Sequence, residues 1–109
     1  MPRVTRPAGM PEGVSTAVHV FGSPARDEIL HQLATGGALT AAELAERIGA
    51  TRKAALEHLK TLEASGLVSA DVPAPSRPGR ELRWTVDRER VSQMLDELAA
   101  YLVESLIVV

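Results

Sequence analysis

The chain of 109 residues contains no cysteine, and its aromatic residues are limited to one Phe, one Tyr and one Trp. The absence of cysteine excludes disulfides, thiol catalysis and thiolate metal sites, and it favours a reducing compartment. The core must therefore be built from Leu, Ile, Val and Ala, which 45% hydrophobic residues allow. The sequence also lacks a long apolar run and a signal peptide. We expect one soluble, cytoplasmic domain.

A strong charge of either sign is also missing, because the formal net charge is −2. This value excludes a general polyanion binder. The charge is unevenly placed, however, since residues 22–49 and 91–109 are acidic. Residues 50–83 instead carry an excess of basic side chains, namely Arg52, Lys53, Lys60, Arg77, Arg80 and Arg83. A locally basic surface on an acidic body favours docking at a specific DNA site over blanket attraction.

Two capped helices joined by a short turn are predicted near the middle of the chain. Thr40 and Glu43 have the spacing of a capping box, and the first helix should end at Gly49. Thr51 is placed to cap a second helix over residues 52–65. This helix should end at Gly66, with Leu62 and Leu67 placed for a Schellman contact. A turn this short forces the helices to cross steeply, as in a helix-turn-helix, where the second helix is the recognition helix.

A further helix is predicted before this pair, because Ser23 and Pro24 form a typical helix start and residues 36–37 are both Gly. Residues 1–13 are rich in Pro and Gly, and we expect them to form a disordered tail. The segment 14–22 is apolar, and its pattern fits a short helix or an added strand.

After residue 66 the hydrophobic pattern changes from helical to alternating, which predicts two strands. The first begins at about Leu67, and the second contains Trp84, whose side chain we expect in the core. Between them, residues 72–80 form a loop with several prolines and basic residues at its tip. A hairpin with a long loop directly after a recognition helix is a wing.

Asp87 should cap a final helix with an apolar stripe along one face. We expect this stripe to form a homodimer interface, because the three-helix core is already closed. The predicted class is α+β, mostly α, with a winged helix-turn-helix over residues 14–86 and a dimerisation helix over residues 87–109. The predicted interface residues are Val91, Met94, Leu95, Leu98, Leu102 and Leu106.

The recognition helix and the wing supply the candidate DNA contacts, with ordinary solvated charges as the alternative. Arg52 lies in the first helical turn, where its guanidinium can reach base edges or phosphates. Glu57 would repel phosphate, so pairing with Lys53 or Lys60 is the favoured interpretation. We expect His58 to be half-buried and bonded to the backbone. The candidate DNA-binding residues are Thr51, Arg52, Lys53, Leu56, Glu57, Lys60, Arg77, Arg80 and Arg83.

No constellation of catalytic side chains is evident, because the three histidines are scattered and no Gly-rich phosphate loop follows a strand. An enzyme is therefore not expected, and neither is a cofactor. The partners expected are double-stranded DNA and a second copy of the chain. A protein-interaction module with little specific DNA binding remains the alternative, and a small-molecule effector stays undetermined.

The chain carries four short runs at defined places: FGSPARDEIL at 21–30, ELA at 43–45, HLK at 58–60 and SGLV at 65–68. This set resembles the ArsR-type winged helix-turn-helix transcriptional regulators, over about residues 18–102. The resemblance implies a dimer through the terminal helices, and such proteins usually repress by occupying operator palindromes. The chain lacks the cysteine pair and the final-helix histidines of metal-sensing members, so a transition-metal sensor is rejected.

Overall fold

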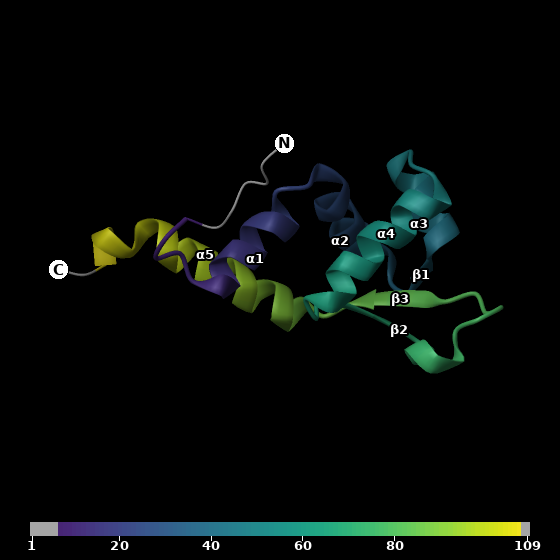
Figure 1. Ribbon diagram of the computed structural model, residues 1–109. Helices are drawn as coiled ribbons and strands as arrows, with labels where there is room; N and C mark the ends of the chain where they lie inside the picture. The colour runs from purple at the N-terminus through teal and green to yellow at the C-terminus, as the bar shows by residue number, and fades with distance from the viewer. Residues whose placement is uncertain (1–6, 108–109) are drawn as a thin grey trace, which may run out of the picture.

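A computed structural model describes the backbone of residues 7–107 and the side chains of residues 7–73 and 75–103. The described chain is mostly helical with a small antiparallel sheet of strand order β1-β3-β2 (Figure 1). The elements in order are α1 (Glu12–Phe21), α2 (Pro24–Gly36), β1 (Leu39–Thr40), α3 (Ala41–Ile48), α4 (Arg52–Ala64), β2 (Val68–Ala70), the 3-10 turn η1 (Ala74–Ser76), β3 (Arg83–Val86) and α5 (Arg88–Ile107).

Side-chain caps fix the starts of the helices that were predicted from the sequence. The Oγ of Ser23 accepts a hydrogen bond from the Arg26 amide at 3.2 Å, at the start of α2. At the start of α3, Thr40 Oγ1 accepts from the Glu43 amide at 3.1 Å and Glu43 Oε1 accepts from the Thr40 amide at 2.9 Å. The capping box is thereby confirmed. These bonds, with that from the Thr40 backbone the largest, lower the pKa of Glu43.

The ends of α3 and α4 also follow the predicted pattern. Gly49 closes α3 with a φ of 71°, a left-handed conformation that glycine adopts without strain. At the end of α4 the Leu67 amide donates to the Leu62 carbonyl at 3.0 Å, and the Gly66 amide donates to the Glu63 carbonyl at 2.9 Å. These two bonds form a Schellman motif. They turn the chain directly from α4 into the wing.

One continuous hydrophobic core joins the helices to the sheet. Its largest member, Trp84 on β3, is 1% exposed, as the alternating pattern predicted. Leu39 and Ala70 pair with Trp84 from the two flanking strands. The sequence did not predict β1, because two extended residues before a helix carry no local strand signal. This strand attaches the wing to the start of α3.

The sequence allowed either a helix or a strand for residues 14–22, and the structure has the helix α1 there. This helix begins before the expected end of the tail at residue 13. Glu12 and Gly13 belong to α1, so the prediction of a disordered tail up to residue 13 is corrected at that end. Val14, Ala17 and Val20 are buried on one face of α1. The helix lies along α5 (Figure 1). This packing stabilises the first turn of α1, although the glycine and prolines there disfavour a helix. Residues 1–6 lie outside the described residues.

Only part of the apolar stripe on α5 faces away from its own domain. Met94 is 2% exposed and belongs to the core, so its prediction as a dimer contact is wrong. Val91 and Leu98 are partly buried against the same core. Of the predicted interface residues, Leu95 and Leu102 are exposed. The physical reason is that α5 packs along α1 and against the core of its own domain. The side chain of Leu106 lies outside the described residues.

Candidate nucleic-acid interface

Helix α4 presents its polar side outward because its apolar side is fully used. Ala55, Leu59 and Leu62 are each 0% exposed and bind α4 to the core. Arg52 and Lys53, in the first turn, are therefore exposed. Thr51 caps the helix, its Oγ1 accepting from the Ala54 amide at 3.0 Å. The start of α4 thus projects two cations from a rigid helix.

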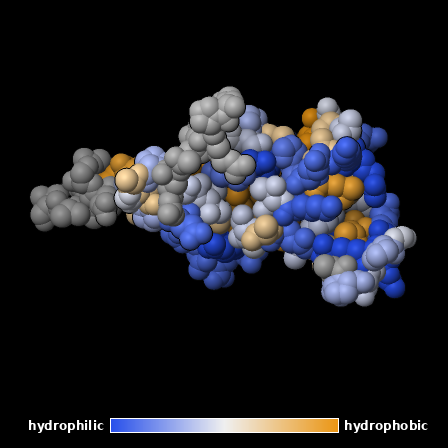
Figure 2. Space-filling model, viewed as in Figure 1, coloured by the Kyte–Doolittle hydropathy of each residue, from blue (hydrophilic) through white to orange (hydrophobic). Residues whose placement is uncertain are grey.

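A hollow of about 280 Å³ lies where α4, the start of α3 and the wing meet. Arg52, Lys60 and Arg80 line it and are exposed. Leu56 and Trp84 line it as well, from α4 and β3. Hydrophobic surface surrounded by hydrophilic residues is visible on the part of the molecule that carries α3 and α4 (Figure 2). The fold therefore brings predicted contacts from the recognition helix and the wing around one depression.

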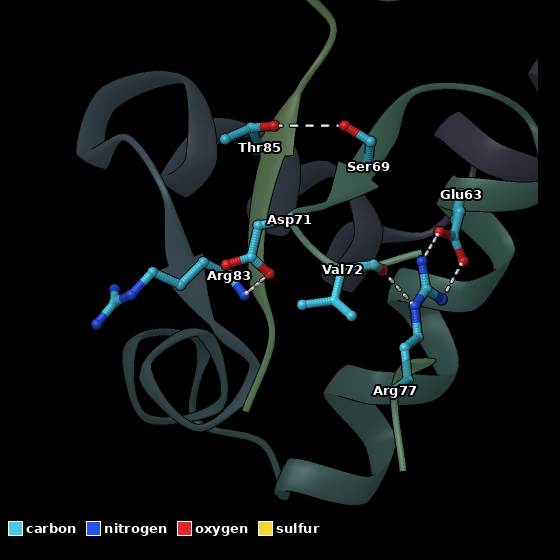
Figure 3. A network of polar contacts seen from close by, with 7 residues as sticks. All are labelled: Glu63, Ser69, Asp71, Val72, Arg77, Arg83 and Thr85. Carbon is cyan, nitrogen blue, oxygen red and sulfur yellow. Dashed lines mark hydrogen bonds and ion pairs between the residues drawn. The ribbon is translucent and has the colours of Figure 1, made fainter. Parts of the chain in front are cut away.

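Arg77 does not project from the wing tip but holds the base of the wing to α4. Its two terminal nitrogens donate to the Glu63 carboxylate at 3.1 and 2.6 Å, and its Nε donates to the Val72 carbonyl at 2.9 Å (Figure 3). The guanidinium carbon also lies 5.5 Å from the centre of the Trp84 ring. The hydrogen bonds from Arg77 lower the pKa of Glu63, and those to Glu63 raise the pKa of Arg77.

This role of Arg77 differs from the sequence-based prediction of a DNA contact. All three guanidinium nitrogens donate to groups of the protein, and the Trp84 ring lies beside them. No local signal could have found its partner, because Glu63 lies 14 residues earlier, on the far side of a proline-containing loop. Arg77 therefore positions the wing, and Arg80 remains the exposed cation of the loop.

Arg83 connects the wing to α3. Its Nη1 lies 3.5 Å from Oε1 of Glu43, and both side chains are about half exposed. The Arg83 main-chain amide donates to Oδ1 of Asp71 at 3.1 Å, while the side chain points away from that carboxylate (Figure 3). Arg83 is thus exposed at the start of the central strand β3 but partly neutralised by Glu43.

Two expectations about α4 are not met by the structure. Glu57 is exposed, and within residues 7–103 it forms no ion pair with Lys53 or Lys60. His58 is half-buried as expected, but its Nδ1 lies 3.2 Å from Nη1 of Arg26 rather than against the backbone. Because Arg26 also donates to the carbonyls of α1, this contact ties α4 to the α1–α2 corner.

Neither a metal cluster nor a membrane span emerges from the described part of the chain. No group of three or more His, Asp or Glu side chains there is placed to hold a metal ion. None of the helices that the structure describes is long and apolar enough to cross a bilayer.

A capped helix pair with a tight turn, followed by a sheet-borne wing, defines the class as a winged helix-turn-helix protein. Comparison with known proteins narrows this class. Residues 21–69 match the family described as "Helix-turn-helix domain". Over 84 residues the chain is 36% identical to the HTH-type transcriptional regulator NmtR of Mycobacterium tuberculosis, a match that covers 77% of this chain. The chain spans 65% of the length of that relative.

Solved structures agree in fold. The crystal structure of an ArsR family transcriptional regulator superposes with a TM-score of 0.70 at 22% identity, covering 94% of this chain and 98% of the other. An ArsR-like transcriptional regulator from Rhodococcus sp. RHA1 superposes with a TM-score of 0.65 at 26% identity, covering 84% and 81%. The predicted resemblance to ArsR-type regulators is confirmed, and the fold is a winged helix-turn-helix.

Proposed function

We propose that the chain is a sequence-specific, double-stranded DNA-binding transcriptional regulator that acts as a homodimer and not as an enzyme. Helix α4 enters the major groove, and the wing loop, residues 72–80, contacts the backbone or the minor groove. The observation that carries the proposal is the exposed basic start of α4 beside a wing whose Arg80 borders the same hollow.

The geometry of α4 suits readout of bases. The major groove admits one α-helix, and contacts to base edges come from the first turns of a recognition helix. Arg52 is placed there and can fork onto guanine O6 and N7, while Lys53 and Lys60 make point contacts with phosphates. Thr51 still has its hydroxyl hydrogen to donate to a phosphate, because its cap uses the oxygen only as an acceptor.

The remaining residues on this face contribute weaker base contacts and positioning contacts to the proposed complex. Leu56 is half-buried at the hollow and can contact a thymine methyl group. Glu57 is exposed and can accept a hydrogen bond from the amino group of cytosine N4. Arg80 and Arg83 supply positioning contacts from the wing. Together these residues provide both base readout and backbone attraction.

A homodimer follows from the apolar surface that α1 and α5 leave exposed. Val18 is 48% exposed, Leu95 45%, Leu102 68% and Val103 41%. Exposed aliphatic side chains on two packed helices are typical of an interface between identical subunits. A two-fold dimer would place two α4 helices on one side of the DNA, matching an inverted repeat. Occupying such a site excludes other proteins from it, which favours repression.

The decisive experiment selects bound fragments from random duplex DNA and measures affinity for the enriched pool at low and moderate salt. We expect an inverted repeat with half-sites about one helical turn apart, and an affinity that falls steeply with salt. Arg52→Ala should weaken specific binding by about 1–3 kcal/mol. Arg88→Ala is the charge-matched control, because Arg88 lies at the start of α5 and donates to the Ala34 carbonyl.

The same experiment can refute the proposal. Absence of any enriched sequence, with weak or no binding at low salt, would favour the protein-interaction alternative. Equal losses for Arg52→Ala and Arg88→Ala would remove Arg52 from the interface while leaving the fold unaffected. Dimerisation is tested separately by sedimentation of Leu102→Glu, which should shift the protein to monomers without unfolding it. An unchanged mass would place the interface elsewhere.

A further inference from the structure

We propose that the hollow between α4 and the wing is a binding site for a small organic anion with a flat apolar body, such as an aromatic carboxylate. Its occupation would compete with DNA, and this second clause rests on the function proposed above. The site would make the DNA-facing surface itself the sensor, without a separate effector domain.

The rim of the hollow is cationic. Arg52 and Lys60 reach it from α4 and Arg80 from the wing, and Glu81 is the carboxylate among the lining residues. Arg77 also lines it, but its charge is already paired with Glu63. Three cations thus face one carboxylate across an open depression, an arrangement that favours one bound negative group.

The floor of the hollow is apolar, and this property distinguishes the hollow from a simple phosphate-binding site. Leu56, Leu82 and Trp84 line it, together with Ala41 and Ala42 at the start of α3. A DNA phosphate gains nothing from such a floor, whereas an aromatic ring is desolvated by it. Small-ligand sites typically combine apolar walls with a few convergent polar groups at volumes of about 300–1,000 Å³, and this hollow of about 280 Å³ lies near the small end of that range.

Trp84, which lines the hollow, also carries a buried donor without a partner. The Nε1 of Trp84 is buried, and within the described residues it has no hydrogen-bond acceptor. Buried polar groups in folded proteins are nearly always hydrogen-bonded, so this donor calls for an acceptor. A carboxylate or hydroxyl oxygen of a ligand is suited to the role once the side chains at the wall adjust. The donor is therefore a second observation, independent of the cationic rim.

The chain offers a direct readout, because Trp84 is its only Trp and gives a single indole N–H signal. We would titrate the protein, without DNA, with naphthoate, neutral naphthamide and inorganic phosphate while recording that signal by NMR. Naphthoate should shift it saturably and bind at least about fivefold more tightly than naphthamide, because of the charge-assisted contacts. Binding of naphthamide equal to that of naphthoate, or no shift with naphthoate, overturns the proposal. If inorganic phosphate shifts the signal as much as naphthoate does, the hollow is a general phosphate-binding site, and this result also overturns the proposal.

Filling the hollow tests the location. Ala42 is exposed and lines the hollow, so Ala42→Leu should lower naphthoate affinity about tenfold. Ala64→Leu, at an exposed position of α4 outside the lining, is the matched control and should bind like the parent. If Ala42→Leu fails to fold, Arg80→Gln serves instead, and it should abolish the preference for naphthoate over naphthamide. Parent-like behaviour of the variant that folds overturns the location.

Competition with DNA is measured last, on the selected operator. Saturating naphthoate should raise the apparent dissociation constant for DNA by the factor that simple mutual exclusion predicts from its own affinity. If no operator is found, the DNA clause falls with the proposed function, but the direct titration still decides whether the hollow binds the anion. If both ligands bind together without interference, the site is distinct from the DNA surface and the competition is refuted.

Discussion

A substitution at Met94 tests how much α5 contributes to the stability of its own chain, apart from any contribution to a dimer. The side chain is 2% exposed within one chain, so Met94→Ala leaves a cavity among residues of the same domain. The truncation removes three heavy atoms, each worth about 0.8 kcal/mol of transfer free energy, and adds a cavity term. We therefore expect a loss of about 3 kcal/mol in the free energy of unfolding.

A loss of this size is large for a chain of 109 residues. It should lower the melting temperature by about 12–24 °C, since each kcal/mol moves a domain of this length by about 4–8 °C. The matched comparison is Leu102→Ala on the same helix. Leu102 is 68% exposed, so its truncation should cost less than about 1 kcal/mol within one chain.

Urea unfolding followed by circular dichroism, at several protein concentrations, measures both quantities. If α5 also forms the dimer interface, the cost of Leu102→Ala should depend on concentration, because dissociation is linked to unfolding. The cost of Met94→Ala should remain when the protein is dilute and monomeric. A loss below about 0.5 kcal/mol for Met94→Ala in the monomer would refute its place in the core and return the residue to the interface.

Three further predictions concern the recognition helix and its supports. Thr51→Ala should destabilise the chain by about 1 kcal/mol in urea unfolding, because the Ala54 amide loses its cap, and an unchanged midpoint would argue against the bond. Gly49→Ala should cost about 1 kcal/mol in thermal unfolding, because φ is 71° there, and a more stable variant would refute this backbone conformation. The pKa of Glu63 is lowered by Arg77, so the stability it contributes is present above the ordinary carboxyl pKa and is lost as the pH falls through the lowered value. The advantage of the parent over Glu63→Gln should be full near pH 7 and vanish in acid, and a difference independent of pH would contradict the pairing.

The parts of the fold that the sequence predicted are those with local signals. The capping box of Thr40, the cap of Thr51 and the Schellman turn at Gly66 each involve residues at most five apart. Such contacts depend only on backbone geometry that neighbouring residues determine. The same holds for the inward position of Trp84, which follows from strict alternation in a short strand.

The parts that sequence reasoning missed depend on partners far away along the chain. Strand β1 exists because Leu39 pairs with Trp84, and the residues next to Leu39 give no signal that predicts this pairing. Met94 shares its stripe with Leu102, and periodicity alone could not show that the core of the domain covers one and leaves the other exposed. In the candidate site, Arg77 looked like Arg80 because both flank the same Pro-Gly turn. Only the position of Glu63 in space distinguishes them.

If the wing contacts DNA as proposed, the ion pair between Arg77 and Glu63 should help recognition by holding the loop in place. A loop with both ends free would lose conformational entropy on contacting DNA, which lowers affinity. Here the base of the loop is fixed to the last turn of α4, to the Val72 carbonyl and over the Trp84 ring. Arg80, three residues beyond Arg77, and Arg52 on α4 both line the same hollow. The proposed DNA contacts and the proposed anion site would share this surface, because Arg52, Lys60 and Arg80 line the same partly apolar hollow.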